Sequence, residues 1–217
     1  MMADPSSIRA LNPLNLVVLI SGNGSNLQAI LGHIAAGRLS ATVAAVISDR
    51  ADAFGLVRAR RAGVPAEVVA RGDYRDAAAF YAALLRRVEA FAPDLVVLAG
   101  FMRVLPERFV GRFAHRMVNI HPSLLPRFKG LNTHQRVLDA GERRHGASVH
   151  WVTAELDAGP VILQAEVEVA PGDNAETLGA RVLCKEHQIY ARAIQWIAEN
   201  RQLAGRGQPL AERAQAS

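Results

Sequence analysis

The feature that most restricts the fold is an uninterrupted apolar run at residues 16–20, followed at once by the turn Ser21-Gly22-Asn23-Gly24. A continuous aliphatic run of this length is typical of a strand that is buried on both faces. A helical pattern over residues 25–36 follows the turn, and Gly37 is placed to end it. Strand, tight turn and helix in this order indicate the beginning of a βαβ unit.

The same alternation extends along the chain. In the first half we predict further strands at residues 42–47, 67–70 and 95–98, and helices at residues 53–62 and 74–91. In the second half we predict strands at residues 117–120, 147–152 and 161–169, the last two antiparallel, and a helix at residues 175–199. The expected class is therefore α/β, with a Rossmann-like, mostly parallel twisted sheet and helices on both faces. We expect a disordered leader over residues 1–14, one domain over 15–200 and a tail over 201–217.

Composition narrows the class of protein. The 217-residue chain carries a net charge of +5 and one cysteine, Cys184. A single cysteine excludes an internal disulfide framework and favours a cytoplasmic protein, and we expect Cys184 to be a small core residue. No apolar run approaches the ~20 residues of a membrane span. The basic excess is not interleaved with aromatic residues, so we expect anionic small molecules as partners, and neither nucleic acid nor a membrane.

The glycine-rich turn is a candidate phosphate site. Its glycines allow close backbone approach, and the following helix presents free N–H groups, to which Ser25 and Asn26 add side-chain donors. A dinucleotide fingerprint requires a third glycine where this chain has Leu27, and the Gly-Lys-Ser/Thr of nucleotide-binding loops is absent. The turn therefore favours one terminal phosphate over a pyrophosphate. The alternative is a simple turn with Ser25 as the N-cap of the helix.

A second group of polar residues belongs to the strand predicted at residues 117–120. Asn119 and His121 are two residues apart, so their side chains lie on the same face, near the carboxyl end of the strand. Asp157 comes later, in a turn rich in glycine and proline. An amide donor, an imidazole and a carboxylate suit acyl or formyl transfer through an oxyanion. For each residue taken alone, a structural role is the alternative.

Two other chemistries lack their residues. His145 and His150 are five positions apart, with no cysteine or glutamate at metal-ligand spacing. The nucleophile motif Gly-x-Ser-x-Gly does not occur. We therefore expect neither a metal nor a covalent enzyme intermediate.

Six segments, taken in order, resemble the phosphoribosylglycinamide formyltransferases, a folate-dependent family of purine synthesis. They are VVLISGNGSNLQ at residues 17–28, SDRADAFG at 48–55, LAGFMR at 98–103, NIHPSLLP at 119–126, HGASVH at 145–150 and DAGPVI at 157–162. The resemblance covers roughly residues 15–200 and implies the formyltransferase fold, with a phosphate-binding first half and a folate-binding second half. It implies transfer of the formyl group of 10-formyltetrahydrofolate to the amine of 5'-phosphoribosylglycinamide, giving formylglycinamide ribonucleotide and tetrahydrofolate in de novo purine biosynthesis.

The resemblance also implies a role for each site residue. Those expected to bind the acceptor are Gly24, Ser25 and Asn26, at its phosphate, and Glu186, at its glycinamide part. Those expected to line the folate pocket are Met102, Arg103, Val104 and Leu105, with a mobile loop at residues 153–159. Asn119 and His121 would bind the formyl oxygen of the folate donor, and Asp157 would favour the protonated form of His121 and position a water that relays the proton. A monomer or weak homodimer is expected, with no metal.

Three positions depart from the family pattern. Ala77 stands where many relatives have an arginine, so either Arg75 replaces that arginine or the contact is lost. Leu183 stands where some relatives have a polar residue. Lys129 stands where a proline often precedes the next glycine, which leaves this loop freer than usual.

Four alternatives stay open on the sequence alone. A methionyl-tRNA formyltransferase and a formyltetrahydrofolate deformylase share the residues around Asn119, but we expect the first to carry a further C-terminal domain and the second a further N-terminal one. A nucleotide-binding oxidoreductase requires the missing third glycine. A basic RNA-binding module leaves Asn119, His121 and Asp157 without a role.

Overall fold

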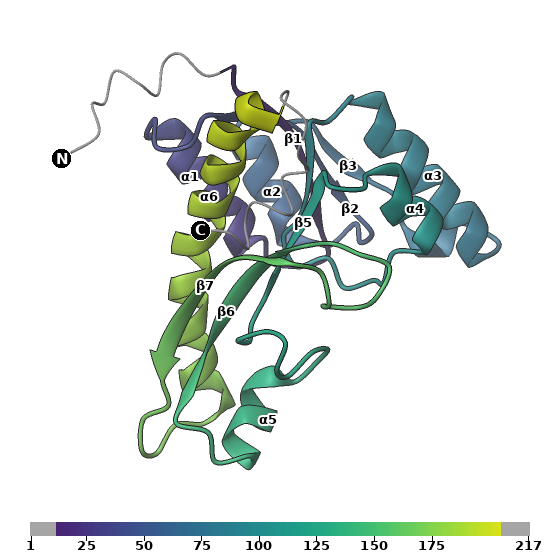
Figure 1. Ribbon diagram of the computed structural model, residues 1–217. Coiled ribbons are helices and arrows are strands. Elements are labelled where there is room, and N and C mark those ends of the chain that lie inside the picture. Colours follow the sequence, from purple (N-terminus) through teal and green to yellow (C-terminus); the bar gives the residue numbers. More distant parts are fainter. Residues whose placement is uncertain (1–11, 205–217) are drawn as a thin grey trace.

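The computed structural model describes residues 12–204, which form a seven-stranded sheet covered by helices (Figure 1). The strands are β1 (Leu14–Ile20), β2 (Ala41–Ser48), β3 (Ala66–Val68), β4 (Leu95–Leu98), β5 (Met117–His121), β6 (Arg144–Trp151) and β7 (Val161–Glu168). The helices are α1 (Ser25–Ala35), α2 (Phe54–Arg61), α3 (Ala77–Ala90), α4 (Glu107–Arg112), α5 (Thr133–Asp139) and α6 (Ala175–Ala204). Of the expected leader and tail, residues 1–11 and 205–217 lie outside the described residues.

The strand order is β3-β2-β1-β4-β5-β6-β7. Strands β1 to β5 are parallel to one another, whereas β6 runs antiparallel to both β5 and β7. The predicted α/β class with a mostly parallel sheet is confirmed. The central strands β1 and β4 are covered on both faces, which explains their uninterrupted aliphatic runs. At the edge of the sheet, β7 is partly exposed along its length.

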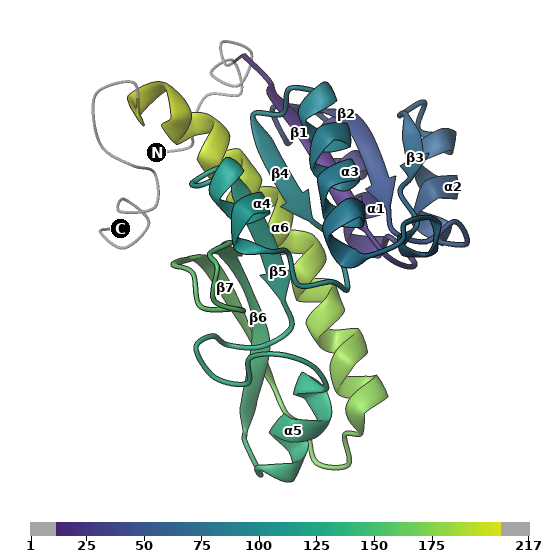
Figure 2. The ribbon, with the colours of Figure 1, turned by 90° about the vertical axis from the view of Figure 1, so that its right-hand side faces the viewer.

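Alternate side chains of β1 face two separate hydrophobic layers. Leu16, Val18 and Ile20 pack in one buried cluster with residues of α1, α2 and α6. Val17 and Leu19 pack in the other cluster with residues of α3 and α4. Figure 2 shows α3 and α4 on the side of the sheet opposite to α6. Helices therefore cover both faces, as predicted. Within residues 12–204, no helix is both long and apolar enough to cross a membrane.

The sequence did not predict the two short helices α4 and α5. Each has fewer than two turns, so neither repeats an apolar position often enough to show a helical period. The third helix begins at Ala77 rather than at Tyr74. The reason is a cap: the side chain of Asp76 accepts a hydrogen bond from the N–H of Ala79 at 2.7 Å.

The buried face of α6 contradicts one expectation. Leu178, Val182 and Ile189 are buried at a helical spacing and belong to the main hydrophobic cluster. Cys184 does not share this spacing and is exposed, so the prediction that it is a core residue was wrong.

The strand order also sets the ligand-binding edge of the sheet. From β1 the sheet is extended in one direction through β2 and β3 and in the other through β4 and β5. Ligands of open α/β sheets bind at such a reversal, outside the carboxyl ends of the strands. The loops after β1 and β4 meet there: the N–H of Ser21 donates to the Gly100 carbonyl at 3.0 Å, and the N–H of Met102 donates to Ser21 Oγ at 2.9 Å.

Candidate active site

The loop after β1 leads into a helix N-terminus that no side chain caps. Gly24 is the N-cap of α1, in the left-handed conformation with a φ of 71°, and Ser25 is already helical. The N–H of Gln28 donates to the Gly24 carbonyl at 2.9 Å, so the N–H groups of residues 25–27 have no partner within the helix. The alternative with Ser25 as the capping residue is therefore wrong. A free N-terminus at the positive end of the helix dipole suits an anion.

Two glycines shape this loop by close packing. A Cβ atom on Gly24 would lie 2.6 Å from the Cα of Gly55, and one on Gly55 would lie 2.4 Å from Ile20 Cδ1. The N–H of Gly55 also donates to the Gly22 carbonyl at 3.1 Å, so the start of α2 packs directly against the loop. An open cavity of about 500 Å³ borders the loop and is also lined by residues that follow β2 and β4.

Asn26 and Glu186 connect the loop to α6. Asn26 Nδ2 donates to Glu186 Oε2 at 2.7 Å, and both side chains are buried. One hydrogen of the Asn26 amide is thus engaged by Glu186. Burial raises the pKa of Glu186, although the hydrogen bond from Asn26 and the charge of His121 oppose that rise. Glu186 is therefore hydrogen-bonded to Asn26 at the start of α1 and lies within the electrostatic influence of His121.

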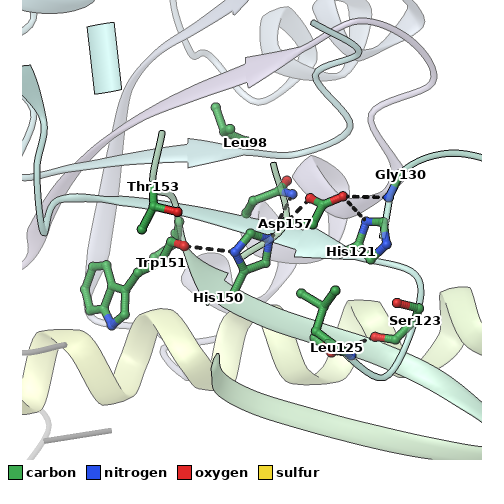
Figure 3. Close-up of polar contacts among 12 residues, drawn as sticks. Leu98, His121, Ser123, Leu125, Gly130, His150, Trp151, Thr153 and Asp157 are labelled. Atoms are coloured by element: carbon green, nitrogen blue, oxygen red, sulfur yellow. Dashed lines mark hydrogen bonds and ion pairs between the residues drawn. The ribbon is translucent and has the colours of Figure 1, made fainter. Parts of the chain in front are cut away.

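His121, the last residue of β5, has a protein partner at each ring nitrogen. Its Nε2 donates to the Phe128 carbonyl at 2.9 Å, since a carbonyl can only accept. Its Nδ1 lies 3.4 Å from Asp157 Oδ2 (Figure 3). Each ring nitrogen of His121 therefore faces an oxygen that can accept a hydrogen bond. The two side chains are only 7% and 6% exposed, and solvent therefore screens their charges weakly.

Asp157 reaches His121 from the loop between β6 and β7. Its φ of 49° is left-handed, a conformation that aspartate adopts more readily than most residues. Besides its contact with His121, its Oδ2 accepts a hydrogen bond from the N–H of Gly130 at 2.9 Å. Its Oδ1 lies 3.7 Å from His150 Nε2. The contacts with His121 and Gly130 hold the carboxylate at the carboxyl end of β5 (Figure 3).

His150 belongs to this site, although the sequence indicated it only as a rejected metal ligand. It lies opposite Asn119 in the pairing of β5 with β6. The predicted strands contain both residues, but the strand predictions do not give the register that pairs them. His150 Nδ1 donates to the Trp151 carbonyl at 2.9 Å, so its Nε2 accepts from Asn119 Nδ2 at 3.2 Å. Burial lowers the pKa of His150, which favours this neutral form. His150 therefore fixes the orientation of the Asn119 amide.

The segment after β4 is held by contacts with several elements. The Tyr81 hydroxyl donates to the Val104 carbonyl at 2.7 Å, and Arg103 pairs with the buried carboxylate of Asp49. The side chains of Met102 and Val104 are 68% and 62% exposed. A fixed backbone with exposed apolar side chains suits the binding of an aromatic ring system. Leu105, by contrast, is buried in the layer formed with α3 and α4.

Ala77 and Arg75 lie outside this group of contacts, whereas Lys129 lies between Phe128 and Gly130, which contact His121 and Asp157. Ala77 is the first residue of α3, and Arg75 pairs with the adjacent Asp76 while its side chain stays 88% exposed. Lys129 pairs with Glu155 of the loop at residues 153–159. Within residues 12–204, no three or more histidine, cysteine, aspartate or glutamate side chains are grouped so as to hold a metal ion.

Known proteins share this architecture. The formyl transferase family model matches residues 14–194. The phosphoribosylglycinamide formyltransferase of Escherichia coli is 50% identical over 188 residues, which are 87% of this chain and 89% of that protein. The solved structure of glycinamide ribonucleotide transformylase 1 from Symbiobacterium toebii matches with a TM-score of 0.85 at 50% identity, over 88% of this chain and 90% of that one.

A deformylase is a more distant match. The formyltetrahydrofolate deformylase of Pseudomonas syringae has a TM-score of 0.80 at 29% identity, over 87% of this chain but 62% of that one. The transformylases are thus more similar in sequence and agree over more of their own length. The chain therefore belongs to the formyl transferase family and, within it, to the phosphoribosylglycinamide formyltransferases.

Proposed function

We propose that this protein transfers the formyl group of 10-formyltetrahydrofolate to the amine of 5'-phosphoribosylglycinamide, giving formylglycinamide ribonucleotide and tetrahydrofolate in de novo purine biosynthesis. The observation that carries the proposal is that two sites share one edge of the sheet. One is the uncapped N-terminus of α1, which suits a phosphate. The other is the group of Asn119, His121 and Asp157, which suits an oxyanion. Glu186 interacts with both.

The acceptor binds through its phosphate to the backbone N–H groups of residues 25–27. Gly24 allows the close approach, because it carries no Cβ and adopts a left-handed φ of 71°. Glu186 accepts hydrogen bonds from the glycinamide part. Since Glu186 interacts with both Asn26 and His121, it directs the acceptor amine from the phosphate site toward the formyl group.

The donor binds to the loops on the other side of the reacting amine. Four large apolar side chains are exposed in loops that carry or adjoin site residues, namely Met102, Val104, Leu131 and Leu156. Exposed apolar side chains around a few fixed polar groups are typical of a site for a flat organic ligand. The pterin and benzoyl rings of the folate donor have this character.

In the reaction, the acceptor amine attacks the formyl carbon, and the formyl oxygen becomes an oxyanion. Asn119 Nδ2 has a second hydrogen besides the one it gives to His150, and it donates this hydrogen to the oxyanion. His121 Nε2 donates as well, so the oxyanion replaces the Phe128 carbonyl as its acceptor. The bond from the formyl carbon to the folate nitrogen then breaks. The proton of the new ammonium passes to that nitrogen through a water positioned by Asp157, without a metal or a covalent enzyme intermediate.

Dependence on the acceptor tests this function. The protein is incubated with 10-formyltetrahydrofolate, with and without 5'-phosphoribosylglycinamide, and both products are measured. We expect tetrahydrofolate to form only with the acceptor present, in an amount equal to the formylated product. Tetrahydrofolate released at the same rate without acceptor would contradict the proposal and identify a deformylase.

Two alanine variants test the assigned roles. Asn119→Ala and His121→Ala should each lower kcat by about 10²–10³, the usual effect of losing one oxyanion donor. Binding of inorganic phosphate should stay unchanged in both variants, because residues 25–27 are not altered. Near-normal turnover in either variant would rule out its role. Action on these small substrates in the cytoplasm, as a monomer or weak homodimer, is part of the same proposal.

A further inference from the structure

We infer that Arg58 is a positioning residue for the phosphate of the acceptor, because it holds the loop at residues 21–24 in its anion-binding shape. Arg58 lies on α2 and does not line the cavity beside the loop. It therefore acts on a bound phosphate through the loop. This inference rests on the proposed function, in that the anion bound at α1 is taken to be the phosphate of the acceptor.

Arg58 joins the loop to both neighbouring helices. Its Nε donates to the Asn23 carbonyl at 2.9 Å, and its Nη2 donates to Asn23 Oδ1 at 3.0 Å. Two donors on one planar edge thus hold the backbone and the side chain of Asn23 together, a geometry that lysine cannot reproduce. The remaining Nη1 donates to Gln28 Oε1 of α1 at 3.2 Å. Asn23 immediately precedes Gly24, the residue that turns the chain into the anion-binding helix.

The guanidinium of Arg58 is itself fixed in place. It lies over the ring of Phe54, with its Cζ 4.8 Å from the ring centroid. The start of α2 is also fixed to the loop, through the hydrogen bond from Gly55 to the Gly22 carbonyl. Two successive loop residues, Gly22 and Asn23, are therefore held by α2. A loop held in this way binds an anion without first having to be ordered by it, which favours affinity.

The charge of Arg58 supports the same assignment. Within residues 12–201, Arg58 pairs with no acidic side chain, whereas many other arginines of this surface do. Its field also extends to α6, where burial and then the charge of Arg58 lower the pKa of His187. An uncompensated positive charge beside the N-terminus of α1 adds to the attraction for phosphate.

Three variants separate positioning from charge. Arg58→Ala removes the charge and all three hydrogen bonds. Arg58→Lys keeps the charge and loses the planar pair of donors. Arg60→Ala is the matched control, because Arg60 lies exposed on the same helix and its side chain makes no hydrogen bond or ion pair within residues 12–201. The measurements are the Kd for inorganic phosphate by calorimetry, the KM for each substrate and the thermal midpoint.

We expect Arg58→Ala to weaken phosphate binding and to raise the KM for the acceptor, each by about tenfold, with the KM for the folate donor within about twofold of wild type. Arg58→Lys should lose at least about threefold in phosphate affinity at an unchanged thermal midpoint, and it carries the test if Arg58→Ala does not fold. Arg60→Ala should match wild type. The inference is overturned if Arg58→Lys binds phosphate like wild type, if Arg60→Ala loses as much as Arg58→Ala, or if both substrate KM values rise together.

The phosphate measurement does not require turnover, so the two proposals can fail separately. If the wild-type protein binds phosphate in an Arg58-dependent way but forms no product, the proposed function fails and the role of Arg58 in anion binding stands. If the wild-type protein is active and Arg58→Lys matches it in every measurement, the role of Arg58 fails alone.

Discussion

Replacing Asp157 by asparagine removes one negative charge from the active site and alters little else. Asp157 Oδ2 lies 3.4 Å from His121 Nδ1, and both side chains are almost fully buried. At this separation, with an effective dielectric constant of about 20, the attraction between the two charges is about 5 kcal/mol. An asparagine oxygen can still accept the hydrogen bond from Gly130. The variant should therefore keep its fold and lose the negative charge that faces His121 Nδ1.

The effect on turnover follows from this energy. About 5 kcal/mol corresponds to a factor of about 5 × 10³ in rate, and this is an upper limit, because burying the carboxylate offsets part of the attraction. We expect kcat to fall by about 10²–10³, measured as formylated product under saturating concentrations of both substrates. The KM for the acceptor should stay within about threefold of wild type, since the phosphate site at α1 is unchanged.

A matched control shows whether the position of the charge matters. Asp139→Asn makes the same change of charge on the exposed surface of α5. We expect its kcat to equal that of wild type. The reasoning is refuted if Asp157→Asn loses less than about tenfold in kcat, or if the control loses as much.

Three further predictions concern buried polar groups. Tyr190→Phe removes a fully buried hydroxyl that donates to the carbonyls of Leu98 at 2.8 Å and Val118 at 3.2 Å, and urea unfolding should show a loss of about 1–3 kcal/mol. Because burial raises the pKa of Glu186, the folded state disfavours its carboxylate. Glu186→Gln should therefore be more stable than wild type at pH 8 and should lose that advantage below the ordinary pKa of 4.5. The same variant should raise the KM for the acceptor. Burial lowers the pKa of His145 from 6.5 to about 4, and the charge of His134 adds to this effect. The stability of the wild-type protein should therefore fall as the pH drops from 6.5 to about 4. Over the same pH range, the urea midpoint of His145→Gln should fall less than that of wild type.

The sequence predicted the parts of the fold that repeat a local pattern. The aliphatic run at residues 16–20 indicated a central strand, and the structure places β1 between β2 and β4. The longer helices were predicted for the same reason, since α1, α3 and α6 repeat their apolar positions over several turns. The short helices α4 and α5 were missed because neither completes two turns.

The contacts between distant segments were harder to predict. Asn119 and His121 could be placed together because they lie on one strand. Nothing in local spacing brings Asp157 to them. The family resemblance supplied the expectation that Asp157 lies beside His121, and the 3.4 Å separation agrees with it. His150 was missed because its role depends on the register of β5 with β6. The engagement of Asn26 by Glu186 joins residues 160 positions apart, which no pattern within either helix indicates.

A structure with bound 5'-phosphoribosylglycinamide tests most directly whether the phosphate site and the oxyanion site serve one reaction. We predict that its phosphate accepts hydrogen bonds from the N–H groups of residues 25–27. Its amine should lie beside Glu186 and within reach of a formyl group bound by Asn119 and His121. A phosphate bound anywhere other than the N-terminus of α1, or an amine directed away from Asn119 and His121, would contradict the account.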